Sequence, residues 1–191
     1  MRPISADLGF NRVTDIVYAR HHGEVAHLFF LQVSQFGGDT FYVNYGASLP
    51  KLGVPWYPER PLKDEGLLID ARLYNADSGQ AYDCGTKAAL ERSLAQVHAD
   101  LKSTAIPWFT KAKTVTQIAK LYYHQWDLRP LGKNQFLKRN GVMQYAFIQL
   151  LQGDRNAALA WFSEARKLMT DTFDEEDRML IDQVTREISA A

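Results

Sequence analysis

The feature that most constrains the fold is a change in the spacing of apolar residues near Asp83. From Val13 to Tyr74 apolar and polar residues alternate, which is typical of strands. After Asp83 the apolar residues recur at helical spacing. Strands followed by helices are the order of the α+β class. We therefore predict a four-stranded antiparallel sheet within residues 1–84, followed by a helical half, residues 85–191, that packs on it.

Three of the expected strands follow one another closely. They are VTDIVYAR, EVAHLFFLQVS and DTFYVNYGASL, separated by the turn sequences HHG and QFGG. Such short connections predict an antiparallel meander of hairpins. The fourth strand, GLLIDARLYN, comes after GVPWYPERPLKDEG, whose prolines cannot run through a strand ladder. That stretch is predicted to be a surface loop.

The helical half contains several apolar stripes and helix boundaries. Leu90, Leu94, Val97 and Leu101 form one stripe and predict a helix from about Thr86 to Ser103. TVTQ, from Thr114, has capping-box spacing, so another helix is expected to begin there. Two further helices are expected to meet at Gly153, and the acids DEED are expected to open a last one.

Composition and charge narrow the possible functions. Lys plus Arg and Asp plus Glu each number 22 in 191 residues, so no net charge recruits nucleic acid or a membrane. No run approaches the roughly 18 apolar residues of a membrane span, and MRPISADLGF has no apolar signal-peptide core. We expect one α+β domain, residues 1–191, in the cytoplasm. The only cysteine, Cys84, rules out an internal disulfide.

The first half of the chain resembles a bacterial family catalogued as domain of unknown function 4304. The resemblance is carried by Gly9, Phe10, Tyr18, Arg20, Gln32, Ser34, Phe41, Asn44, Gly46 and Pro50. It implies an antiparallel sheet with helices in a bacterial protein, and it carries no established catalytic residues.

A second resemblance covers only Gln144 to Met169. Gly153, Ala158, Phe162 and Ala165 are similar to the small and aromatic packing residues of a tetratricopeptide hairpin. Since such repeats need about three units to form a continuous core, we interpret the segment as one helical hairpin docked on the sheet. A peptide-binding groove is the alternative.

The sequence predicts neither a catalytic centre nor a metal site. The five histidines lack the i, i+4 spacing of a helical zinc site, and one cysteine cannot build a structural zinc site. No glycine-rich phosphate loop follows a strand, and GxSxG is absent. We therefore expect no cofactor, no metal and no catalytic residue, and an enzyme of unrecognised type stays an alternative.

One face of the predicted sheet carries the candidate binding residues. On DTFYVNYGASLP, Tyr42 and Asn44 share a face, while Phe41, Val43 and Tyr45 point into the core. The candidate binding face consists of Gln32, Tyr42, Asn44, Asp70 and Arg72. Asparagine is a poor strand former. Its presence in mid-strand indicates either that it satisfies buried polar groups or that it binds a ligand.

The charge layout supplies a further alternative. Residues 102–139 mix basic and aromatic side chains, and residues 171–191 are acidic. Lys111, Lys113, Lys120, Lys138 and Arg139 could hold nucleic acid by phosphate contact, with aromatic rings stacking on bases. We interpret the two segments instead as structural complements.

These observations favour a non-enzymatic protein that acts through protein contacts, such as an immunity-type protein that neutralises a toxin. Its expected partner is another protein. Binding of nucleic acid through residues 102–139 is the alternative.

Overall fold

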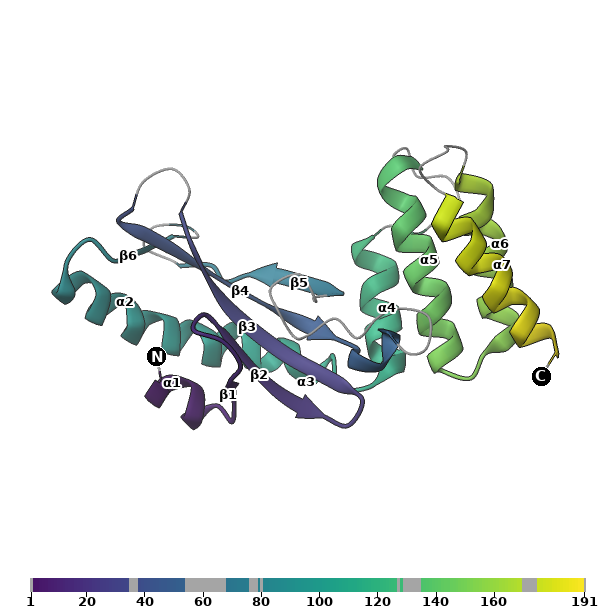
Figure 1. Cartoon of the computed structure of the whole chain (residues 1–191). Coiled ribbons are helices and arrows are strands. Elements are labelled where there is room, and N and C mark those ends of the chain that lie inside the picture. Colours follow the sequence, from purple (N-terminus) through teal and green to yellow (C-terminus); the bar gives the residue numbers. More distant parts are fainter. Residues whose placement is uncertain are drawn as a thin grey trace. The chain divides into compact units, whose positions relative to one another are not determined.

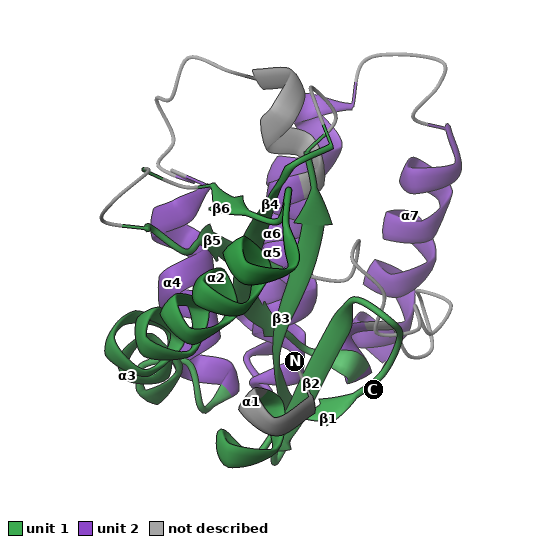
Figure 2. Cartoon of the chain, turned by 90° about the vertical axis from the view of Figure 1, so that its left-hand side faces the viewer, with its two compact units in different colours: residues 1–50, 60–114 green, residues 51–59, 115–191 purple. Residues whose placement is uncertain are grey.

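The computed structural model describes residues 2–34, 38–53, 68–75, 79, 81–126, 128, 135–169 and 175–190, with the side chains of residues 2–4, 53 and 135–140 excepted. The chain divides into two compact units (Figure 2). Unit 1 is Met1–Pro50 with Arg60–Thr114, and unit 2 is Lys51–Glu59 with Val115–Ala191. Except for Gly53 and Leu128, the predicted proline-rich loop and the stretch DLRPLGKN lie outside the described residues.

Unit 1 is built on an antiparallel sheet of six strands. The strands are β1 (Asn11–Arg12), β2 (Val17–His22), β3 (Val25–Val33), β4 (Thr40–Ser48), β5 (Ile69–Arg72) and β6 (Tyr82–Asp83). Their order is β1-β2-β3-β4-β5, and β6 pairs with β4. The antiparallel meander is confirmed, but the predicted count of four strands is too low. The additional strands β1 and β6 have two residues each, too few to produce an alternating pattern.

Helices of the same unit lie along one face of this sheet (Figure 1). They are α1 (Arg2–Asp7), α2 (Lys87–Asp100), the π-helical segment η3 (Leu101–Ala105) and α3 (Ile106–Thr110), while the short 3-10 helix η1 spans Pro50–Gly53. Thr86 caps α2 by accepting a hydrogen bond from Ala89 N. The α+β class is therefore confirmed, and the first part of the helical half packs on the sheet as predicted.

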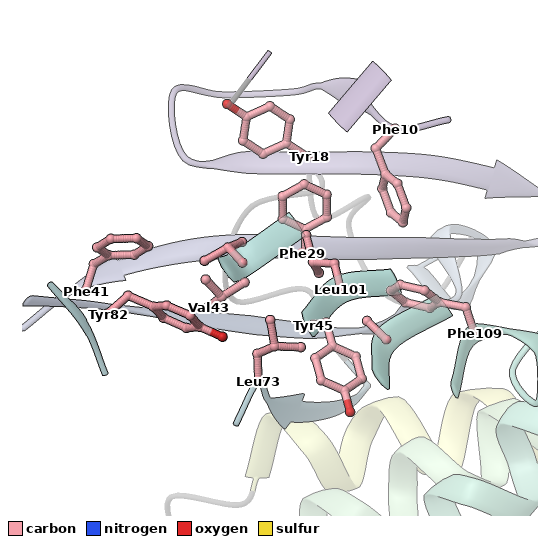
Figure 3. Close-up of a cluster of buried hydrophobic side chains, with 12 residues drawn as sticks. Phe10, Tyr18, Phe29, Phe41, Val43, Tyr45, Leu73, Tyr82, Leu101 and Phe109 are labelled. Carbon is pink, nitrogen blue, oxygen red and sulfur yellow. The ribbon is translucent and has the colours of Figure 1, made fainter. Parts of the chain in front are cut away.

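The core of unit 1 lies between this sheet face and the helices (Figure 3). Phe29, fully buried at the centre of β3, stacks on Tyr18 at 4.9 Å between ring centroids and meets Phe10 edge-on at 5.0 Å. Val97, Leu101 and Phe109 close the cluster from the helical side. Tyr82 belongs to the same cluster, and its hydroxyl donates to Asp100 Oδ2 at 2.8 Å, which ties β6 to α2.

The opposite face of the sheet carries a second, smaller apolar cluster. Val17, Ala19, Ala26 and Leu28 are buried there, and Phe30 packs against them while partly exposed. The alternation in HLFFLQVS predicts large burial for both Phe29 and Phe30. The structure confirms this for Phe29 and only in part for Phe30. Apolar side chains nevertheless occupy both faces of β3, which indicates a central strand.

Unit 2 consists of four helices among the residues described. They are α4 (Val115–Gln125), α5 (Gln135–Leu151), α6 (Arg155–Leu168) and α7 (Glu175–Ala190). The expected boundaries at Thr114, at Gly153 and at the DEED acids all hold. Gly153 turns the chain between α5 and α6 with a φ of +81°, a conformation that suits glycine.

Helices α5 and α6 pack closely as a hairpin. Ala158, Phe162 and Ala165 of α6 are fully buried, and Phe162 meets Phe147 of α5 edge-on at 4.9 Å. Three of the four residues that suggested a tetratricopeptide hairpin are therefore buried, and the fourth, Gly153, lies in the turn. In the parts of the chain described, no helix combines the length and apolar character needed to cross a membrane.

Candidate functional site

The candidate face lies on three neighbouring strands of unit 1. In the antiparallel register Gln32 stands opposite Tyr42, Asn44 opposite Arg72, and Gly46 opposite Asp70. Phe41, Val43 and Tyr45, which alternate with these residues, are buried in the core cluster. The period of two therefore places all five candidate residues on the face opposite that core.

Four of the five residues form one connected group, which we call the Arg72 array: Gln32, Tyr42, Asn44 and Arg72. Arg72 Nε donates to Asn44 Oδ1 at 3.0 Å, and Arg72 Nη2 donates to Gln32 Oε1 at 3.1 Å. Asn44 Nδ2 donates to the same Gln32 oxygen at 3.1 Å. The hydrogen bonds thus run from β3 across β4 to β5.

The chemistry of arginine fixes the orientation of both amides. A guanidinium can only donate, so Asn44 and Gln32 must each turn an oxygen toward Arg72. The Asn44 amide nitrogen then points to Gln32, whose oxygen accepts two hydrogen bonds. Each group holds the others in one arrangement, which explains how a mid-strand asparagine is tolerated.

Tyr42 supplies a surface on which the guanidinium lies. Arg72 Cζ lies 4.4 Å from the centre of the Tyr42 ring, a distance at which cation–π attraction operates. Asn44 is only 5% exposed, Gln32 and Tyr42 are partly exposed, and Arg72 is exposed. The array therefore has a buried base and an exposed charged end.

Asp70 and Tyr74 flank the array on the β5 side. Asp70 is exposed, two residues before Arg72 on the same strand face. Tyr74 is 62% exposed, whereas the preceding Leu73 is buried in the core. Asp70 belongs to the predicted face by position, while the hydrogen bonds and ring contact that define the array come from the other four residues.

A second polar site lies inside the core of unit 1, and sequence reasoning did not single it out. His27 is 1% exposed, and its Nε2 lies 2.7 Å from Ala112 O. Because a carbonyl only accepts, Nε2 carries the proton, and Nδ1 is free to accept from Arg20 Nε at 3.3 Å. His27 therefore joins β2 to the turn that follows α3.

The surroundings of His27 favour its neutral form. The pKa of His27 is lowered from 6.5 to about 4, chiefly by burial and in smaller part by the charge of Arg20, against the opposing effect of the Ala112 hydrogen bond. Arg20 itself lies over Phe10 and Phe109 and donates to Leu8 O at 3.1 Å. This site is a structural junction.

Two aromatic rings of the basic segment 102–139 are buried within their own units. Phe109 in unit 1 and Tyr122 in unit 2 are fully buried, so neither ring can stack on a base. Lys111 and Lys113 belong to unit 1 and Lys120 to unit 2. The side chains of Lys138 and Arg139 lie outside the description. Asp182 of the acidic last helix, α7, forms an ion pair with Arg166 of α6 at 2.9 Å.

Within the described ranges, no three His, Cys, Asp or Glu side chains are placed to share a metal ion. Cys84 is partly exposed, and its Sγ donates to Gly38 O at 3.7 Å.

Comparison of the chain with protein-family models, with curated proteins and with solved structures found no match. The two family resemblances therefore stay predictions. Five of the ten residues that carry the first one fall into two groups. Phe10, Tyr18 and Phe41 lie in the core of unit 1, whereas Gln32 and Asn44 lie in the Arg72 array.

Proposed function

We propose that this protein is a non-enzymatic interaction module that binds another protein through the sheet face around the Arg72 array. The observation that carries the proposal is the state of Arg72. It is exposed, yet it is held by two hydrogen bonds and lies on an aromatic ring. A side chain already held in one place loses less entropy on binding than a free one.

The composition of this face supports the same proposal. Arginine and tyrosine are enriched among the residues that dominate binding energy at protein interfaces. Arg72, Tyr42 and the 62% exposed Tyr74 gather on one part of the sheet. An array that served packing alone would not need an exposed, positioned cation at its outer end.

An immunity-type protein that neutralises a toxin is the particular kind of module we favour. Such proteins act by covering a surface of their target, which needs no catalytic group in the module itself. The arrangement of neighbouring genes bears on this point directly. A toxin gene directly upstream of the gene for this protein would support the immunity role. If the neighbouring gene encodes another class of protein in many genomes, that class would indicate a different partner.

Site-specific photo-crosslinking tests the proposal. Tyr74 is replaced by the photoreactive amino acid p-benzoylphenylalanine, and Val13, 45% exposed near β1, is replaced in the same way as the control. We expect a discrete crosslinked product from position 74 and none of that mass from position 13. The captured protein is then purified and titrated against the wild type and Arg72→Glu.

Two results would contradict the proposal. One is equal crosslinking from positions 74 and 13, which indicates contact without a preferred face. The other is a purified partner that binds Arg72→Glu as tightly as it binds the wild type, with denaturant melts showing that both proteins are folded under the assay conditions. The second result would assign the array to packing.

A further inference from the structure

The guanidinium of Arg72 uses one edge for the array, and no described residue accepts a hydrogen bond from its outer edge. Nε and Nη2 form the side edge of the planar group, and this edge donates to Asn44 and Gln32. Among contacts between described residues, the outer N–H groups on Nη1 and Nη2 have no acceptor. These two parallel donors form a second fork, at the exposed end of the side chain.

The charge of Arg72 is not neutralised by the groups that hold it. Both acceptors are amide oxygens, and the third contact is an aromatic ring. Amide oxygens satisfy donors without cancelling the positive charge, so the exposed end keeps its attraction for an anion. A planar fork with two parallel donors matches the two oxygens of a carboxylate.

We propose that the Arg72 array recognises a single carboxylate on the partner protein, from an aspartate, a glutamate or a chain terminus, through the outer fork of Arg72. This inference rests on the proposed function and names the chemistry of the same face. Tyr42 fixes the plane of the guanidinium, and Asn44 and Gln32 fix its rotation. The partner's carboxylate then accepts the two hydrogen bonds that the outer fork of Arg72 can donate.

The neighbours of Arg72 favour a carboxylate over a phosphate or a nucleic-acid strand. Asp70 lies on the same face two residues away. Its negative charge opposes the binding of a doubly charged phosphate more than that of a singly charged carboxylate. A polyanion would need several cations along its path, and the other members of the array are neutral. Tyr74, beside the array, offers apolar surface to a protein partner.

An NMR titration of the full chain tests this inference without any partner. Arginine side-chain resonances of the ¹⁵N-labelled protein are followed during addition of sodium acetate, with sodium chloride holding the ionic strength constant. Sodium phosphate is titrated in parallel. Arg92, exposed on α2, is the internal control. We expect acetate to produce a saturable shift at Arg72 with an affinity about fivefold higher than at Arg92.

Substitutions distinguish the contribution of the two-donor geometry of arginine from that of its positive charge. In Arg72→Lys the charge remains but the fork is lost, so the saturable acetate shift of the backbone amide at position 72, followed in the wild type and the variant alike, should disappear. In Gln32→Ala or Asn44→Ala the guanidinium loses one of its fixed acceptors, and the acetate affinity at Arg72 should fall toward that of Arg92. Either variant serves if the other does not fold.

The outcomes distinguish this inference from the proposed function. Equal shifts at Arg72 and Arg92, or tighter binding of phosphate than of acetate at Arg72, would overturn carboxylate recognition. The crosslinking result at position 74 would stand unchanged in either case. A selective acetate response without any crosslinked partner would instead support the carboxylate site and count against the protein-binding role.

Discussion

Arg72 and Asn44 stand directly opposite each other on β5 and β4, and Arg72 Nε donates to Asn44 Oδ1 at 3.0 Å. This bond connects an exposed cation to a side chain that is 5% exposed. A mid-strand asparagine is therefore explained by its hydrogen bonds, and those bonds in turn hold an arginine in place at the surface. Packing and recognition depend on the same residues.

Replacement of Asn44 by alanine should destabilise unit 1. The change removes both hydrogen bonds of a buried amide, and we expect the free energy of unfolding to fall by about 1 to 3 kcal/mol. Urea denaturation measures this loss. Tyr42→Phe keeps the ring under Arg72 and is the matched control, with an expected change within about 0.5 kcal/mol. An Asn44→Ala protein of full stability that loses its partner would show that the residue acts in binding alone.

Truncation of the two phenylalanines of β3 should have unequal effects. Phe29 is fully buried among Tyr18 and Phe10, so Phe29→Ala should cost about 3 to 5 kcal/mol. Phe30 is partly exposed on the opposite face, and its truncation should cost clearly less. Denaturant melts of the two variants provide the comparison. A loss below about 1 kcal/mol for Phe29→Ala would refute the assignment of the core.

The buried His27 should make stability depend on pH. Its pKa is about 4 in the folded chain against an ordinary 6.5, so the unfolded chain binds the proton more readily. The stabilising contribution is therefore complete above about pH 6.5 and is lost as the pH falls toward 4. The difference corresponds to about 3 kcal/mol.

The comparison with His27→Gln isolates this effect, because glutamine does not titrate. Unfolding free energies of both proteins are measured between pH 7 and pH 4, the range that spans the ordinary and the folded pKa of His27. The wild type should lose more stability over this range than the variant does. Parallel curves for the two proteins would mean that His27 is protonated equally in the folded and unfolded chain.

The turn between α5 and α6 allows a test in unit 2. Gly153 has a φ of +81°, and an added Cβ would meet no atom within 4 Å. Gly153→Ala should therefore cost about 1 kcal/mol through backbone strain alone. Gly38 also has open space around it but no positive φ, so Gly38→Ala is the control and should be neutral or slightly stabilising. Equal effects at both positions would contradict the assigned turn conformation.

The spacing of residues in the sequence predicted much of this architecture for physical reasons. Side chains alternate strictly along a strand, so the pattern around Asn44 placed Gln32, Tyr42 and Arg72 on one face before any pairing was known. An asparagine in mid-strand also signalled a need for hydrogen-bonding partners. Both arguments depend on local periodicity, which a single sequence contains.

Other features depend on contacts that no local pattern reveals. His27 meets Ala112 across 85 positions of the chain, and Arg20 reaches it through a hairpin register. The strands β1 and β6 have two residues each and exist only because β2 and β4 offer them hydrogen bonds. The division into two compact units likewise follows from the distribution of tertiary contacts.

The affinity of the purified partner for Arg72→Lys, measured beside the wild type, tests the central claim most directly. Lysine keeps the positive charge but has no fork and cannot donate to Asn44 and Gln32 together. We expect binding about tenfold weaker, which corresponds to about 1.4 kcal/mol, under conditions in which urea melts show both proteins to be folded. Equal affinities for wild type and Arg72→Lys would contradict the claim that this positioned arginine is a binding group.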